Sequence, residues 1–263
     1  WDIIGHNHEV ELLEENIVKG NLHHAYLLVG PQGVGKFRVA RVLAGILQCE
    51  NNYCHTCPTC IQIEKRGHPD TVELQDDGES IKIGAVREII ARLNMTGNSR
   101  YKIVLIKNCG RLTEEAANCL LKTLEEPPPN TLFVFTATNK AEVLPTIISR
   151  VALIRFKKLP DAILKKYLQE KFPEVDDETL NEIIFLSLGR CGKALKLLNN
   201  PELFAEQREL YRLIPFLQEK ATPATRFMTI QEFTKDPKKL HTFLELLTNY
   251  LRRSMLTKPT LEG

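Results

Sequence analysis

The feature that most constrains the fold is a glycine-rich segment between an apolar run and an amphipathic run. Residues 25–29 (Ala-Tyr-Leu-Leu-Val) form the apolar run, and residues 30–36 read Gly-Pro-Gln-Gly-Val-Gly-Lys. Apolar residues then recur at helical spacing over residues 39–47. A strand, a glycine-rich turn and a helix in this order match the first seven positions of the phosphate-binding P-loop. The segment therefore predicts an α/β fold in which Gly30, Gly33, Gly35 and Lys36 surround phosphate groups.

Four further β-rich runs follow, separated by amphipathic segments. We expect strands at residues 71–74, 102–106, 131–136 and 151–156. A helix is expected from Glu114 to Glu126, with Thr113 as its N-cap and Pro127 as its stop. Strands that alternate with helices are typical of a parallel sheet with helices on its faces. Residues 1–158 are thus predicted to form one α/β domain with a five-stranded parallel sheet.

After residue 158 the strand-like runs end and amphipathic segments follow one another. We expect a small helical domain at 159–201 and a second all-helical domain at 202–263. The last domain is short for an independent bundle, so we expect it either to be truncated or to pack on another chain. Its last apolar stripe comprises Leu240, Phe243, Leu244, Leu247 and Leu251.

Charge and hydropathy exclude several classes of protein. Lysine and arginine number 35 against 33 acidic residues, and a net charge of +2 excludes a protein whose whole surface binds nucleic acid. No apolar run approaches the roughly 18 residues of a membrane span, and no secretory signal is visible. Four of the seven cysteines lie between Cys49 and Cys60, which favours a metal site in a reducing cytoplasm over a disulfide framework. We therefore expect a cytoplasmic protein.

The P-loop lacks the groups that normally hold magnesium. Its eighth position, usually Ser or Thr, is Phe37, which has no oxygen. After the strand at 102–106, where active P-loop ATPases place an Asp and commonly a Glu, the chain has Lys107 and Asn108. Phosphoryl transfer depends on positioning and on charge stabilisation around the metal. We expect no binding and hydrolysis of ATP with Mg²⁺ at this site, although a phosphate neutralised by Lys107 remains an alternative.

The cysteine cluster has the spacing of a metal site. Cys54, Cys57 and Cys60 are separated by two residues each, and Cys49 lies upstream. Four thiolates surround Zn²⁺ tetrahedrally in structural sites, so we expect a structural zinc module at about 49–60. His55 or His68 is an alternative to Cys49, and a thiol–disulfide pair or unligated cysteines are alternatives to zinc. Cys109, Cys119 and Cys191 are expected to be buried or half-buried.

Three segments together resemble a known family. They are Asn118-Cys-Leu-Leu-Lys-Thr-Leu-Glu-Glu-Pro-Pro128, His24-Ala-Tyr-Leu27 and Leu144-Pro-Thr-Ile-Ile-Ser-Arg150. The first is similar to a helix signature of bacterial sliding-clamp loader subunits, which are AAA+ proteins of the DNA polymerase III holoenzyme, and the resemblance covers residues 3–160. It implies an AAA+ domain, a helical lid at 159–201 and an oligomerising collar at 202–263.

The resemblance also implies roles for individual residues. In this family the Ser-Arg pair, here Ser149 and Arg150, reaches across a subunit interface to the neighbour's ATP, although Val151 stands where the family usually has Cys. A second arginine that contacts nucleotide in motor subunits corresponds to Gly192, with Arg190 and Lys193 nearby. The resemblance further implies a zinc module after the P-loop helix.

The chain combines an intact Ser149-Arg150 pair with a P-loop that lacks its metal ligands, and in this combination it resembles delta prime, the non-hydrolysing subunit type of the family. The implied partners are gamma/tau and delta subunits in a hetero-pentamer, primer–template DNA bound weakly without sequence preference, and the sliding clamp indirectly, with no membrane. The alternative functions are a gamma/tau-like ATPase with a divergent site and an unrelated P-loop regulator with a zinc ribbon.

Overall fold

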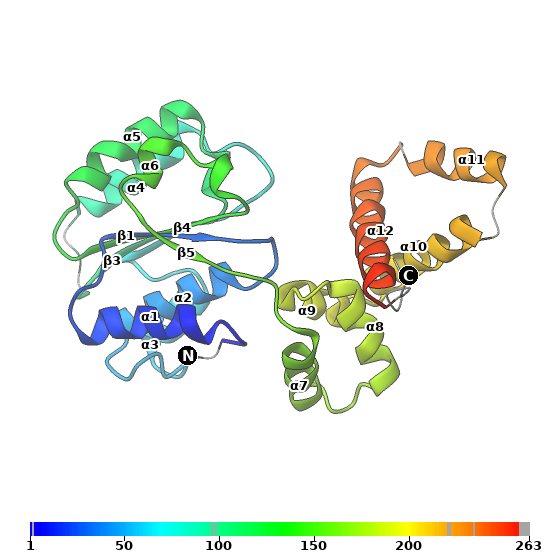
Figure 1. The fold of residues 1–263 in the computed structure, drawn as a ribbon. Helices are drawn as coiled ribbons and strands as arrows, with labels where there is room; N and C mark the ends of the chain where they lie inside the picture. Colours follow the sequence, from blue (N-terminus) through cyan, green and yellow to red (C-terminus); the bar gives the residue numbers. More distant parts are fainter. Residues whose placement is uncertain (2, 96, 98, 220–221, 234, 258–263) are drawn as a thin grey trace, which may run out of the picture. The chain divides into compact units, whose positions relative to one another are not determined.

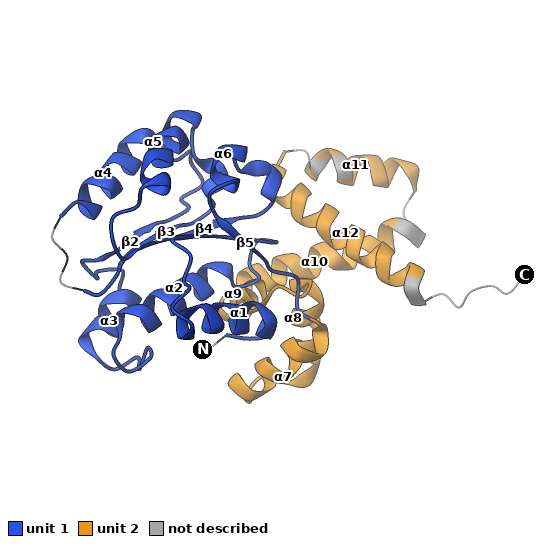
Figure 2. Cartoon of the chain, turned by 60° about the vertical axis from the view of Figure 1, so that its left-hand side comes forward, with its two compact units in different colours: residues 1–159 blue, residues 160–263 orange. Residues whose placement is uncertain are grey.

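The computed structural model describes residues 1, 3–95, 97, 99–219, 222–233 and 235–257 of the chain. The described chain divides into two compact units, residues 1–159 and residues 160–263 (Figure 2). Among the described residues, no helix combines the length and apolar character that crossing a bilayer requires.

Within the described residues, unit 1 is built on a five-stranded parallel sheet in the order β2-β3-β4-β1-β5. The strands are β1 (Ala25–Val29), β2 (Thr71–Leu74), β3 (Lys102–Ile106), β4 (Thr131–Ala137) and β5 (Ala152–Arg155). The predicted fold class is confirmed, and β1, β2 and β3 have the predicted bounds. Strand β5 is one residue shorter at each end, although the Phe156 N–H still donates to Val29 O at 2.7 Å.

The side chains of each central strand alternate between two hydrophobic cores because a strand points successive residues to opposite faces. On β1, Tyr26 and Leu28 pack with helices α1 and α2, whereas Leu27 packs with α4 and α5 on the other face. The strands are buried on both faces, as expected for a parallel sheet covered by helices. Figure 1 shows the resulting three layers.

Six helices of the described part of unit 1 cover the sheet, and their ends follow from local sequence. Thr113 accepts a hydrogen bond from the Ala116 N–H and begins α5, which ends at Glu125 before three prolines. The helices are α1 (Asn7–Val18), α2 (Lys36–Gln48), α3 (Pro58–Glu64), α4 (Ile83–Leu93), α5 (Glu114–Glu125) and α6 (Pro145–Ile148), with 3₁₀ turns η1 (Cys109–Arg111) and η2 (Lys140–Glu142).

All secondary-structure elements in the described part of unit 2 are helices. Its helices are α7 (Asp161–Lys171), α8 (Asp177–Ser187), α9 (Cys191–Asn199), α10 (Pro201–Glu219), α11 (Pro223–Phe233) and α12 (Pro237–Thr257). On α12, Leu244 and Leu251 of the expected stripe are exposed, and Leu246 is buried beside Phe243 instead. A boundary between lid and collar at residues 201–202 remains a prediction, since residues 160–263 form one compact unit.

Candidate functional site

The carboxyl ends of β1, β4 and β3 meet at one edge of the sheet because these parallel strands are neighbours. The P-loop follows β1 there and leads directly into α2. Gly35 precedes α2 with a φ of 110°, a conformation that side chains rarely adopt. A Cβ atom on Gly30 would lie 2.3 Å from the Phe156 backbone oxygen, so only glycine fits. The loop thus has the backbone shape of a phosphate cradle.

Lys36 turns its ammonium group back onto the P-loop. Its Nζ donates to Gly30 O at 2.5 Å and to Pro31 O at 2.8 Å. Burial lowers the pKa of Lys36 to about 8, partly offset by the negative charge of Glu142. In this conformation, the lysine neutralises loop carbonyl dipoles and would have to leave them to contact a phosphate.

The P-loop position that usually supplies a hydroxyl for the metal holds an aromatic ring, Phe37, which two cations approach. The Phe37 ring lies 5.8 Å from the Lys107 ammonium and 5.4 Å from the Arg41 guanidinium carbon. Both distances are within the range of a cation–π contact. Arg41 also holds Glu73, whose side chain is only 3% exposed, through hydrogen bonds of 2.8 and 2.6 Å. The ring thus belongs to a connected group of charged side chains at the end of the sheet.

Asn108 lies just after β3, where active P-loop ATPases commonly carry a Glu, and it is held by other polar groups. Its backbone N–H donates to the Thr136 hydroxyl at 2.9 Å, and its amide donates to an Asp76 carboxylate oxygen at 3.0 Å. Arg111 contacts the other oxygen of Asp76 at 3.2 Å. Asp76 therefore carries a carboxylate near this edge, but its oxygens are already engaged by an amide and a guanidinium.

Arg150 lies in the turn after α6 and binds groups of its own unit. Its Nη1 donates to Thr146 O at 2.8 Å and to the Ser149 hydroxyl at 3.0 Å. Its Nε donates to Glu125 Oε1 at 3.0 Å, and its Nη2 donates to the same oxygen. The Arg150 side chain is 32% exposed and that of Glu125 is 50% exposed. The predicted arginine is accessible, and a carboxylate from α5 neutralises it.

Arg190, which the sequence suggested as a substitute phosphate contact, has a structural partner within unit 2. Its Nη1 and Nη2 donate to the two carboxylate oxygens of Glu245 on α12 at 3.1 and 2.7 Å. The Arg190 side chain is 10% exposed. The guanidinium therefore links the start of α9 to α12.

The four cysteines of the predicted zinc module come together at the end of α2 and the start of α3. The Sγ atoms of Cys49, Cys54, Cys57 and Cys60 all lie within 4.8 Å of one another. The sulfur of Cys49 lies 3.8 Å from that of Cys54 and 3.7 Å from that of Cys57. Tetrahedral zinc with bonds of about 2.3 Å places its sulfur ligands about 3.8 Å apart. The spacing of the sulfurs therefore fits zinc.

Groups around the cluster favour thiolates. The N–H groups of Asn51 and Cys60 each donate to a cysteine sulfur at 3.4 Å. Hydrogen bonds from Thr56 lower the pKa of Cys54 to about 5, whereas burial raises that of Cys60. Such donors commonly surround metal-bound thiolates. A bound zinc ion would crosslink α2 to α3, and four protein ligands would leave it no open position for catalysis.

The histidines that were alternatives to Cys49 lie outside this cluster. His55 Nδ1 contacts a Glu64 carboxylate oxygen at 2.7 Å. His68 is buried, and its Nδ1 has no hydrogen-bond partner within the described part of the chain. Cys49 is thus the fourth residue that the structure brings to the other three cysteines.

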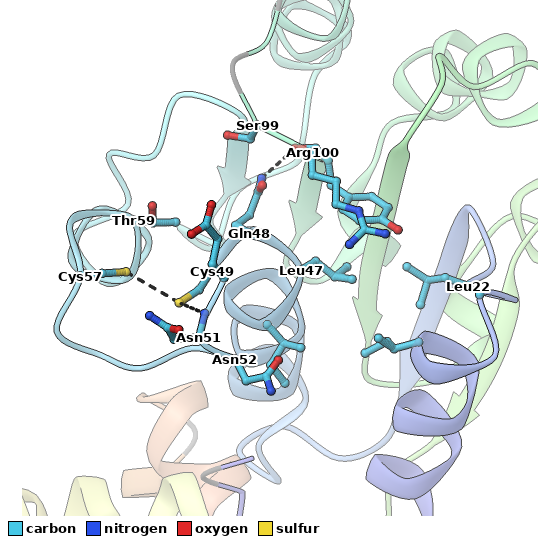
Figure 3. A pocket seen from close by; sticks show the side chains of 15 residues that line it. Leu22, Leu47, Gln48, Cys49, Asn51, Asn52, Cys57, Thr59, Ser99 and Arg100 are labelled. Atoms are coloured by element: carbon cyan, nitrogen blue, oxygen red, sulfur yellow. Dashed lines mark hydrogen bonds between the residues drawn. The ribbon is translucent and has the colours of Figure 1, made fainter.

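A cavity of about 760 Å³ lies beside the cysteine cluster (Figure 3). Leu22 and Leu47 form apolar parts of its wall, and Gln48, which donates to Tyr101 O at 2.8 Å, forms a polar part. None of its lining residues belongs to the P-loop, so this cavity is separate from the candidate nucleotide site.

The sequence singled out the P-loop, the cysteines and Arg150, but it did not indicate the charged partners of Arg41 and Arg150. Arg41 lies four residues after Phe37 on α2, and this spacing places both side chains on one helix face. Glu125 lies in the helix signature at residues 118–128, but neither Glu73 nor Glu125 was expected to bind an arginine, because each is distant in sequence from its partner.

The parallel sheet with a P-loop at its edge, followed by a helical unit, defines the AAA+ class of P-loop proteins. The chain belongs to the DNA polymerase III clamp loader family: the family model described as "DNA polymerase III, delta subunit" matches residues 5–160.

Individual relatives carry names from the same complex. The chain is 34% identical over 208 residues to a DNA polymerase III subunit gamma of Buchnera aphidicola (subsp. Acyrthosiphon pisum), covering 76% of this chain and 57% of that protein. It is 32% identical over 244 residues to the subunit delta' of Bacillus subtilis, covering 86% and 73%. The chain thus spans little more than half the length of the gamma relative.

The fold is also similar to that of a solved structure. The Thermotoga maritima RuvB Holliday junction branch migration motor matches with a TM-score of 0.52 and 17% identity, covering 81% of this chain and 64% of that one. At this identity, the likeness shows the fold alone.

Proposed function

We propose that the chain is a non-hydrolysing, delta prime-like subunit of a bacterial clamp loader. The observation that carries the proposal is the cation–π contact between Lys107 and Phe37 at the two positions where active sites hold Mg²⁺. A divalent cation there would meet an ammonium group and an aromatic ring in place of oxygen ligands. Lys36, buried against loop carbonyls, is not poised to receive outer phosphates.

The proposed contribution of the chain to catalysis is Arg150, with Ser149 beside it. An arginine supplied in trans stabilises charge on a transferring phosphoryl group, and guanidinium is always charged. The accessibility of Arg150 in the described structure supports this role. The proposed neighbours are gamma/tau and delta subunits in a hetero-pentamer, with the helices of residues 202–263 as the collar.

The proposal also includes a bound zinc ion, contacts with DNA and the sliding clamp, and a location in the cytoplasm. Cys49, Cys54, Cys57 and Cys60 would hold one structural zinc ion, which their sulfur spacing supports. Primer–template DNA would be contacted weakly and without sequence preference through phosphates, and the sliding clamp indirectly. A role in chromosome replication would place the chain in the cytoplasm.

The test measures ATP hydrolysis by the chain alone and in a complex reconstituted with gamma/tau and delta subunits of its own organism. We expect no Mg²⁺-dependent turnover by the chain alone. In the complex, Arg150→Ala should lower turnover at least about tenfold at the site it contacts, because trans arginines contribute 10³–10⁵-fold in related phosphoryl transfers. The melting temperature of the variant chain should equal that of the wild type. Unchanged turnover in a fully assembled Arg150→Ala complex would refute the role of this arginine.

A second candidate is a gamma/tau-like ATPase with a divergent site, favoured by the identity to gamma subunits. The same assay separates the two functions. Saturable, Mg²⁺-dependent hydrolysis by the purified chain would support the ATPase and contradict the non-hydrolysing subunit.

A further inference from the structure

The guanidinium of Arg150 is almost fully engaged within its own chain. Four hydrogen bonds from its three nitrogens reach Glu125, Thr146 O and Ser149. A guanidinium has five N–H donors. A planar two-point contact with a phosphate on a neighbour therefore requires Arg150 to release partners that it now holds.

Among these partners, Glu125 is the one that carries a charge. It stands at the last residue of α5, and both Nε and Nη2 of Arg150 point at its Oε1 atom. With half of its side chain exposed, Glu125 forms an ion pair that water screens. Such a pair is easily exchanged, and an outer phosphate with about two negative charges attracts a guanidinium more strongly than one carboxylate does.

We propose that Glu125 is a positioning residue that keeps Arg150 folded back on its own subunit until a neighbour presents the outer phosphate of a nucleotide. The inference rests on the function proposed above. Arg150 exchanges the carboxylate for the phosphate when ATP is present and returns to Glu125 when the outer phosphate is gone. The pair thus makes the availability of the arginine depend on the nucleotide state of the neighbour.

The test is Glu125→Gln in the reconstituted complex, which keeps the size of the side chain and removes its charge. We expect the kcat for ATP hydrolysis to rise by two- to fivefold, since an exposed pair of this kind shifts a population by no more than about fivefold. The rise should shrink as salt is added, because salt screens the pair in the wild type as well. Glu125→Asp, which retains the charge, should return kcat toward the wild-type value.

Two controls make the result specific to the pair. Glu126→Gln removes the same charge from the exposed next residue and should leave kcat unchanged. Glu125→Gln combined with Arg150→Ala should behave as Arg150→Ala alone. If Arg150→Ala lowers kcat but Glu125→Gln leaves it unchanged or lowers it, the inference is overturned while the proposed function stands. If Arg150→Ala has no effect, the role proposed for Arg150 in trans is overturned, and the inference about Glu125 is overturned with it.

Discussion

At the scale of single residues, Phe37 and Lys107 act together. The ring of Phe37 gives the Lys107 ammonium a favourable contact of about 0.5–2 kcal/mol, which a magnesium ligand at position 37 would not provide. Arg41 approaches the same ring and is fixed by the buried carboxylate of Glu73. The contact between Phe37 and Lys107 is therefore favourable in itself, and a change of Phe37 alone leaves the Lys107 ammonium in place.

This arrangement predicts that metal binding returns only when both positions change. Phe37→Thr with Lys107→Asp restores a hydroxyl and a carboxylate, so we expect ATP to bind at least about tenfold more tightly with Mg²⁺ than with EDTA. Phe37→Thr alone, which leaves Lys107 charged, is the matched control and should show no such difference. Isothermal titration calorimetry measures both. Tighter binding with Mg²⁺ by the wild type would contradict the prediction.

At the scale of elements, a tight connection joins α2 to α3. Cys49, Cys54 and Cys57 lie in this connection, and Cys60 lies in the first turn of α3. Gly45 makes this possible, since a Cβ atom there would lie 2.1 Å from the Tyr53 ring. Asn52, Tyr53 and His55 have φ values of 49–62°, in the left-handed region. Each such residue costs about 1–2 kcal/mol. A metal ion that holds the cysteines would offset this strain.

Metal removal is accordingly expected to destabilise unit 1. Elemental analysis of the natively purified chain should find about one Zn²⁺ per molecule. Cys49→Ser should lose the metal and lower the free energy of unfolding by about 3 kcal/mol, which corresponds to a Tm lower by roughly 10 °C. Cys119→Ser, at a half-buried cysteine outside the cluster, should keep both metal and Tm. If the natively purified wild-type chain contains no metal and has the same Tm as Cys49→Ser, the zinc site is refuted.

At the scale of the whole molecule, each of the two units has its own buried side chains, and ion pairs connect distant helices within unit 2. The pair of Arg190 and Glu245 joins α9 to α12 across 55 positions of sequence. Burial raises the pKa of Glu245, but the hydrogen bond and charge of Arg190 outweigh burial, and the pKa lies below its ordinary 4.5. The folded state therefore favours the carboxylate more than the unfolded state does.

The sign of the resulting pH dependence follows from this shift. The stabilisation is fully present above pH 4.5 and is lost as the pH falls through the folded-state pKa of Glu245. Glu245→Gln should lower the free energy of unfolding by about 1–2 kcal/mol at pH 7 and flatten its decrease below pH 4.5. Urea unfolding followed by circular dichroism measures both effects. Glu209→Gln, at an exposed position of α10, is the control, and an equally steep decrease in Glu245→Gln would contradict the prediction.

The sequence by itself determined the features that depend on near neighbours. Strands β1 to β3, the cap at Thr113, the P-loop and the cysteine spacing were all readable, because apolar runs, glycine turns and caps act within a few residues. The grouping of the four cysteines was also partly legible, since Cys49 is separated from Cys54 by only four residues, whereas their role as zinc ligands stays a prediction.

Tertiary structure alone decided which charges meet. Glu73 lies 32 residues from Arg41, Glu125 lies 25 from Arg150, and Glu245 lies 55 from Arg190. A local pattern carries no record of such pairs, because they form only after separate elements pack. The burial of Leu246 in place of Leu244 has the same origin: several faces of α12 are apolar enough to pack, and contact with α10 and α11 selects one of them.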